Sequence, residues 1–345
     1  MGMLDKARDR THALRNRWAY RATGSDAAKP APARRRWIPG RESPWLRRGA
    51  IILAVFLLLY YPIGAIWAHK VDDTLDFQIQ SDVLPGQSRA VAMTADLIDR
   101  EVNQNGWVAN APFFMPPAIL DNMPSFQKGV VAALARFAFE LTDQLGRTRG
   151  SSEADADLQS AAGLLQYPGD VWIWDPTVSL APTATSEAQY RRAMRALRSY
   201  NARLAEGDAT FQKRADNLQA TLDRIALDIG STSAVLDRHV MERSGFPIDT
   251  QADDLFYFTK GQVYGYYLIL GELGRDFEAL IAERELDDAW REMTDSMAQT
   301  VGLDPWVVMD GAPDSQFVPS HLAAQGFYVL RARTQLREIT SILLK

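Results

Sequence analysis

The sequence predicts an all-α protein, in which a single N-terminal transmembrane helix precedes an extracytoplasmic bundle of long helices with aromatic and Pro-rich loops. Three observations predict it. Apolar residues recur at helical spacing along most of the 345 residues. No alternating run of Val, Ile and Thr is long enough for a strand. Nineteen residues without a charge, Ala50–Ala68, stand near the start of the chain.

The uncharged stretch has the length of one membrane span, because about 20 apolar residues cross the ~30 Å hydrocarbon core of a bilayer. Trp45 and Trp67 stand 22 positions apart, about 33 Å along a helix, which suits the two interfacial aromatic belts. A cleaved signal peptide is the alternative, but the stretch begins some fifty residues into the chain and no small-residue cleavage motif follows it. We therefore expect the protein to contact the lipid bilayer through residues 50–68.

Charge is divided unevenly on the two sides of this stretch. Residues 1–49 carry 13 Lys and Arg against 4 Asp and Glu, whereas residues 69–345 carry 25 against 39. The positive-inside rule therefore predicts a cytoplasmic N-terminus and a C-terminal domain outside the cytoplasm. We expect three parts: a disordered basic tail over 1–49, the transmembrane helix over 50–68 and an all-helical domain over 69–345. The acidic balance of the last part argues against nucleic acid as a partner.

Helices are expected nearly throughout the third part. One of them, over 255–270, is aromatic on nearly every face, so it is either the central helix of the bundle or a second span. Lys260 and Gln262 lie inside it and favour the buried helix. The expected helical ranges are 88–104, 124–145, 152–166, 185–243, 250–283, 285–299 and 320–344.

The tract 185–243 carries a heptad-like stripe. Steps of four and three residues from Tyr190 to Leu236 meet an apolar residue at eleven of fourteen positions. This register favours one long helix with a weak point at Gly207 that packs within the chain. A hairpin is the alternative, because Gly207 followed by Asp208 is also a helix stop followed by a cap.

Two irregular segments, Gly106–Pro124 and Tyr167–Pro176, are rich in aromatic residues, and their prolines interrupt any helix. Their rings either cover the ends of the bundle, form a groove for a partner or ligand, or dip into the membrane. A third segment, Gly146–Ser152, is expected between two helices, where exposed backbone N–H groups favour anions. Its arginines either bind an anion or only complement a helix dipole. The candidate ligand or partner surface comprises Trp107, Phe113, Phe114, Trp172, Trp174, Arg147 and Arg149.

Several short runs carry a resemblance to a known family. They are NAPFF at 110–114, LDNMPSFQ at 120–127, RTRGSS at 147–152 and DNLQATLDRI at 216–225. With these runs the chain resembles an uncharacterised family of proteobacterial inner-membrane proteins, number 2333 in the domain-of-unknown-function series. The resemblance implies a Gram-negative inner-membrane setting, in which the domain that the charges place outside the cytoplasm would be periplasmic. It implies no activity, substrate or catalytic residue.

The sequence contains few signs of catalytic chemistry. It has no cysteine, and its histidines, His12, His69, His239 and His321, are isolated without metal-ligand spacing. We therefore predict no catalytic residue, no metal and no cofactor. The favoured function is a non-enzymatic scaffold or partner-binding component of the cell envelope, with an envelope protein as partner. The alternative is an envelope enzyme or binding protein that acts on lipid or peptidoglycan through the aromatic loops.

Overall fold

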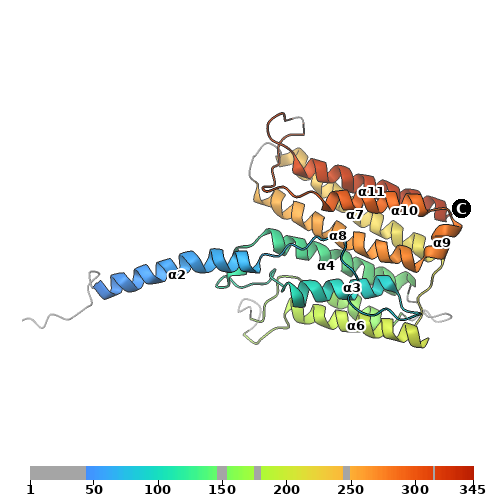
Figure 1. Ribbon diagram of the computed structural model, residues 1–345, viewed down its shortest axis with the longest axis horizontal. Coiled ribbons are helices and arrows are strands. Elements are labelled where there is room, and N and C mark those ends of the chain that lie inside the picture. Colours follow the sequence, from blue (N-terminus) through green and yellow to red (C-terminus); the bar gives the residue numbers. More distant parts are fainter. Residues whose placement is uncertain (1–43, 146–153, 175–179, 244–248, 314) are drawn as a thin grey trace, which may run out of the picture. The chain divides into compact units, whose positions relative to one another are not determined.

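The computed structural model describes residues 44–145, 154–174, 180–243, 249–313 and 315–345 (Figure 1). The described residues are helical apart from loops and one isolated bridge between Asp310 and Ser320, which confirms the all-α class. The helices are α2 Pro44–Ala68, α3 Arg89–Asp99, α4 Asn122–Glu140, α5 Ala156–Leu165, α6 Ser186–Glu206, α7 Ala215–Arg243, α8 Thr250–Asp276, α9 Glu278–Glu283, α10 Asp287–Val301 and α11 His321–Leu343. Short π-helical turns, Arg100–Gln104 and Leu141–Leu145, continue α3 and α4, and a 3-10 turn covers Pro116–Ile119.

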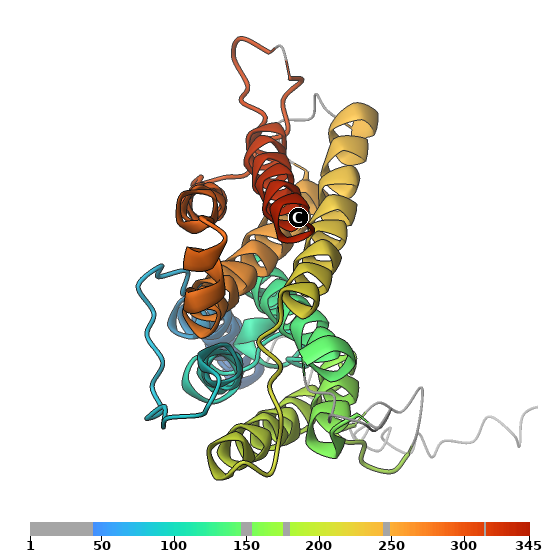
Figure 2. The same cartoon turned by 90° about the vertical axis from the view of Figure 1, so that its right-hand side faces the viewer.

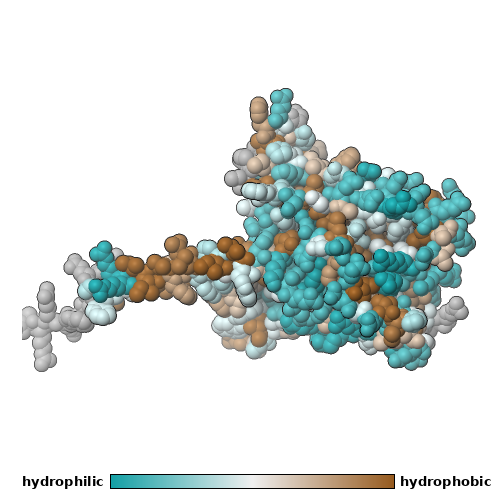
Figure 3. All heavy atoms as spheres, in the orientation of Figure 1, coloured by the Kyte–Doolittle hydropathy of each residue, from teal (hydrophilic) through white to brown (hydrophobic). Residues whose placement is uncertain are grey.

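Helix α2 is the helix of the described residues that is long and apolar enough to cross a membrane. Its apolar side chains are largely exposed along its length (Figure 3). It begins at Pro44, earlier than predicted, because proline suits the first position of a helix. The rest of the predicted basic tail, residues 1–43, lies outside the described residues. The chain divides within α2 into two units, residues 1–56 and 57–345.

The second unit contains a bundle in which α4 and α8 lie between two groups of helices (Figures 1 and 2). Helices α7, α10 and α11 form one group, and α3, α5 and α6 form the other. Phe256, Tyr264 and Ile269 of α8 are fully buried. Helix α8 is therefore a central helix of the bundle, as its aromatic residues predicted, and not a second span.

Helices α4 and α8 cross with their backbones in contact. A Cβ atom added at Gly261 of α8 would lie 2.0 Å from the carbonyl oxygen of Phe126, and one added at Gly129 of α4 would lie 2.0 Å from that of Phe258. One turn further along the crossing, a Cβ atom added at Gly265 would lie 2.9 Å from the Cβ atom of Ala133. Each helix thus presents two small residues four positions apart, and these allow the close approach.

The prediction of one long helix over 185–243 is wrong. The alternative is correct that a helix ends at Gly207, but the two helices do not pack on each other as a hairpin. Helix α6 ends at Gly207, whose φ of 83° is left-handed, and the chain runs without helix from there to Ala215. Helix α6 packs on α3 and α5, whereas α7 packs on α11. The predicted stripe is still buried, for example at Leu197 and Leu222, but its two halves face different helices.

Candidate functional site

The two aromatic segments meet in the structure. The rings of Phe114 and Trp172 are 5.6 Å apart, edge to face. The indole Nε1 of Trp107 donates a hydrogen bond to the carbonyl oxygen of Gly169 over 2.7 Å. The amide Nδ2 of Asn110 donates to the carbonyl oxygen of Val171 over 2.9 Å. Residues predicted from two separate runs of sequence thus form one surface.

The rings of this surface have different environments. Trp107 is half-buried and packs edge to face on Tyr190, with ring centroids 5.0 Å apart, so it covers the core. Phe113 is 85% exposed and Trp174 is 52% exposed, so they project outward. Arg147 and Arg149, the remaining predicted residues, lie outside the described residues.

The first aromatic loop is also joined to the C-terminal part of α2. The hydroxyl of Tyr61 donates to the carbonyl oxygen of Phe113 over 2.9 Å, and the hydroxyl of Tyr60 donates to that of Phe114 over 3.3 Å. One turn further along α2, a Cβ atom added at Gly64 would lie 2.4 Å from the ring of Pro116. Sequence reasoning missed this contact, although a tyrosine pair late in an apolar stretch is a usable signal.

A hollow of about 440 Å³ opens between the two loops. Trp172 and Trp174 line it, together with Asn110, Pro112 and the carboxylate of Asp170. The hollow thus combines flat apolar rings with a few polar groups, a combination typical of sites that bind a ligand or a short segment of a partner.

Two buried cations of the bundle hold the segment that follows α2. Lys260 of α8 is 1% exposed, and its Nζ lies 2.6 Å from a carboxylate oxygen of Asp73. The same Nζ donates to the carbonyl oxygen of Leu303 over 3.0 Å. The lysine that argued against a second span therefore anchors the chain where it leaves α2.

Arg100 is the second buried cation. Its guanidinium pairs with Glu101 at 2.7 Å and lies 3.7 Å from Asp72. It also donates to the hydroxyl of Tyr264 over 2.6 Å, and that hydroxyl donates to the carbonyl oxygen of Thr74 over 2.9 Å. Burial raises the pKa of Glu101, and the charge of Arg100 opposes that rise. Arg100, Lys260 and Tyr264, with residues 72–74, are called the clamp.

A separate cleft of about 580 Å³ lies between α4 and α7 over α8. Its polar centre is Asp228, which accepts hydrogen bonds from Tyr266 over 2.6 Å and from Gln262 over 2.8 Å. Arg136 lies 3.6 Å from the other carboxylate oxygen of Asp228. Through these contacts, Asp228 of α7 binds side chains of α8 and α4. We therefore interpret its role as structural.

Glu140 of α4 is fully buried, and neither of its carboxylate oxygens has a hydrogen-bond partner in the described structure. Burial raises its pKa to about 7, against the opposing effect of Arg224 and Arg136. Between about pH 4.5 and 7, the native state therefore keeps a proton on Glu140 that the unfolded state has lost. The contribution of Glu140 to the free energy of unfolding falls as the pH rises through this range.

We expect Glu140→Gln to raise the free energy of unfolding of the domain at pH 8 by on the order of 3 kcal/mol. At pH 4.5 the substitution should change the free energy of unfolding little. Urea unfolding at both pH values measures the difference. The exposed Glu283→Gln is the control and should change neither value. An equal effect of Glu140→Gln at the two pH values would contradict the interpretation.

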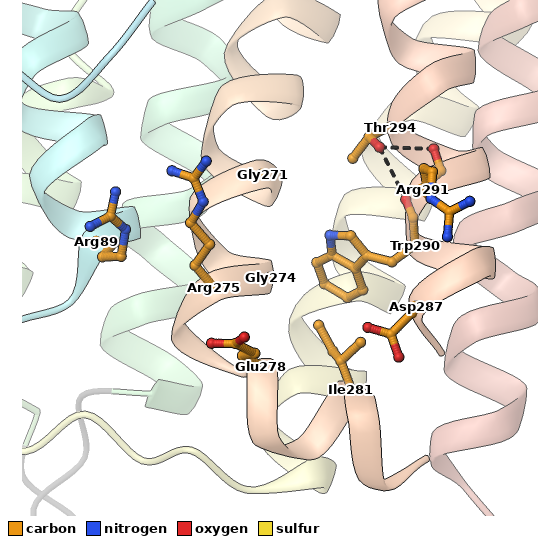
Figure 4. Close-up of a pocket in the computed structure, with 10 residues that line it drawn as sticks. All are labelled: Arg89, Gly271, Gly274, Arg275, Glu278, Ile281, Asp287, Trp290, Arg291 and Thr294. Carbon is orange, nitrogen blue, oxygen red and sulfur yellow. Dashed lines mark hydrogen bonds between the residues drawn. The ribbon is translucent and has the colours of Figure 1, made fainter. Parts of the chain in front are cut away.

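A groove of about 760 Å³ lies between α8 and α10 (Figure 4). Gly271 and Gly274 line it on α8, and Trp290 faces them from α10. Its three arginines are paired with carboxylates: Arg89 and Arg275 with Glu272, and Arg291 with Asp288. Because Glu278 and Asp287 also line the groove, its arginines are outnumbered by nearby carboxylates, and the groove is a poor site for an anion.

The sequence suggested that His239 is isolated, but in the structure two carboxylates lie close to it. Its Nε2 lies 3.1 Å from Asp249, which caps α8, and 3.7 Å from the buried Asp310. Burial raises the pKa of Asp310. His321 accepts a hydrogen bond from the backbone N–H of Met309 over 2.9 Å. Within the described ranges, no three His, Asp or Glu side chains are grouped to hold a metal ion.

A protein-family model matches more than half of the chain. A model described as an uncharacterized protein conserved in bacteria, DUF2333, matches residues 41–251. The chain belongs to the DUF2333 family. This confirms the resemblance found in the sequence. The DUF2333 match spans α2 to α7, including both aromatic loops, and ends where α8 begins. No curated protein and no solved structure matches the chain.

Proposed function

We propose that this DUF2333 protein is a membrane-anchored, non-enzymatic component of the bacterial cell envelope. In this proposal α2 crosses the inner membrane, the N-terminus is cytoplasmic, and the helical domain is a periplasmic scaffold for an envelope protein. The observation that carries the proposal is the clamp, in which two buried cations hold Asp72 and Asp73 directly after an apolar helix.

The clamp suits a scaffold because it fixes the segment between anchor and domain. Ion pairs from two buried cations to Asp72 and Asp73 limit the freedom of residues 72–74, whereas a domain on a flexible tether would need no such contacts. A scaffold must hold its binding surface at a set distance from the membrane. The excess of Lys and Arg before α2 and of Asp and Glu after it supports the periplasmic orientation.

The hollow between the aromatic loops, with Trp174 at its edge, is the proposed partner site. Among the residues that the structure describes, one carboxylate, Asp170, lines this hollow. Hydrolysis of a glycosidic bond uses two carboxylates that flank the bond. The combination of aromatic rings and a few polar groups in the hollow supports a binding role.

Reporter fusions and membrane washing test the anchor and the orientation. Alkaline phosphatase fused after Lys345 should be active in intact cells, and the protein should stay with the membranes in alkaline carbonate. A matched chain that lacks residues 44–68 should lose both properties. An inactive fusion to the full chain, or its release by carbonate, would contradict the proposal.

Photo-crosslinking tests the partner surface. A benzophenone side chain in place of Trp174 should give a discrete adduct in intact cells. The same side chain in place of Met241, which is 85% exposed on α7, should give none. Equal labelling at both positions, or no adduct at position 174, would overturn the partner-binding role and leave the anchor untouched.

A further inference from the structure

We infer that residues 111–120, here called the apolar loop, enter the outer leaflet of the membrane beside α2, so that lipid is a direct binding partner of the periplasmic domain. This inference rests on the proposed function, because it requires α2 to span the bilayer. It adds a second membrane contact, made by a loop of the bundle.

The depth of the apolar loop follows from its hydrogen bonds to α2. Its Phe113 and Phe114 carbonyl oxygens accept hydrogen bonds from Tyr61 and Tyr60, which lie within the uncharged stretch. Tyr61 precedes Ala68, the last residue of α2, by seven residues, or about 10 Å along the helix axis. If the stretch fills the ~30 Å hydrocarbon core, a loop bonded to Tyr61 lies at the depth of acyl chains.

The composition of the apolar loop fits that position. No charged residue occurs from Gly106 to Leu120. In water the loop would expose Phe113, which is 85% accessible, and Ile119, which is 56% accessible. Each exposed aromatic ring gains free energy when lipid replaces the water around it. A contiguous set of such side chains beside an anchor marks a membrane-contact surface.

Many backbone groups of the apolar loop are paired within the protein, which lowers the cost of moving the loop into a medium without water. Unpaired N–H and C=O groups are costly at membrane depth. Pro112, Pro116 and Pro117 have no N–H to satisfy. The tyrosine hydroxyls pair two of the carbonyl groups. The N–H groups of Ala111, Met115, Ala118 and Leu120 all donate to nearby carbonyl oxygens.

The absence of cysteine from the chain allows a direct test. Single cysteines at Leu58, Phe113 and Leu344, each an exposed residue, are labelled with the environment-sensitive fluorophore NBD in the full chain. The labelled proteins are reconstituted in vesicles of phosphatidylethanolamine and phosphatidylglycerol, with or without nitroxide-labelled lipid. We expect the nitroxide to quench position 58 in α2 and position 113 in the loop at least twofold, and to leave position 344 at the C-terminus unquenched.

The three positions separate the two proposals. If position 58 is quenched and position 113 is not, the anchor stands and the lipid contact of the loop is overturned. If neither is quenched, both proposals fail. If position 113 loses its exposure to water only when membrane proteins are added, the loop binds protein and the inference is also overturned. Circular dichroism checks folding, and Ile119→Cys replaces Phe113→Cys if the latter does not fold.

Discussion

Gly261→Val is expected to destabilise the bundle by about 4 kcal/mol or more. At this position α8 crosses α4, and a Cβ atom would lie 2.0 Å from the carbonyl oxygen of Phe126. The obstructing atom belongs to a helix backbone, so no side-chain rotation relieves the clash. The two helices must separate, which opens the packing around buried residues such as Phe126 and Tyr264. Thermal unfolding of the full chain in detergent, followed by circular dichroism, measures the loss.

Gly271→Ala is the matched control, because it lies on the same helix. Nothing lies within 4 Å of a Cβ atom added there. Alanine is the better helix former, so this variant should gain about 0.5–1 kcal/mol. If Gly261→Val melts as the parent protein does, the close crossing of α4 and α8 is wrong.

Arg100→Met is expected to cost about 3–5 kcal/mol at pH 7, because it leaves the fully buried carboxylate of Glu101 without its cation. Burial already raises the pKa of Glu101, and loss of Arg100 removes the charge that opposes this rise. The native state of the variant then binds a proton more tightly than the unfolded state does. Its stability should therefore fall as the pH rises, so the loss is larger at pH 8 than at pH 5.

Urea unfolding at the two pH values tests this expectation. The double variant Arg100→Met with Glu101→Gln should recover part of the loss, because it removes the stranded charge. Arg214→Met is the control, since Arg214 and its partner Asp216 are both exposed and such pairs contribute about 0–1 kcal/mol. A loss from Arg100→Met that does not change with pH would show that the guanidinium acts by packing alone.

The central position of α8 was predictable, because a helix that is buried on all faces carries apolar and aromatic residues around its whole circumference, and this pattern is visible in the local sequence. The clamp was not. Lys260 was visible as a charge inside an apolar helix, but its partner Asp73 lies far away in the sequence. Nothing in the local pattern selects that carboxylate over the many others, because the choice depends on how the helices pack.

The tract 185–243 shows how periodicity misleads. The apolar stripe keeps its phase across Gly207, but phase carries no information about whether the backbone stays helical between the two parts. The left-handed φ of Gly207 ends α6, and α7 then packs on a different helix. For the aromatic loops, the residues were predictable from composition, whereas the inward position of Trp107 and the outward position of Phe113 depend on contacts with Tyr190 and Tyr61.

The crossing of α4 and α8 has a consequence for biosynthesis. Helix α4 ends at Glu140, and α8 begins at Thr250, 110 residues later. At a synthesis rate of about 5–20 residues per second, the ribosome needs roughly 5–20 s to make that interval. Throughout this time the side of α4 that α8 will cover has no native partner. The nascent chain must therefore keep this apolar side from aggregating until α8 has been synthesised.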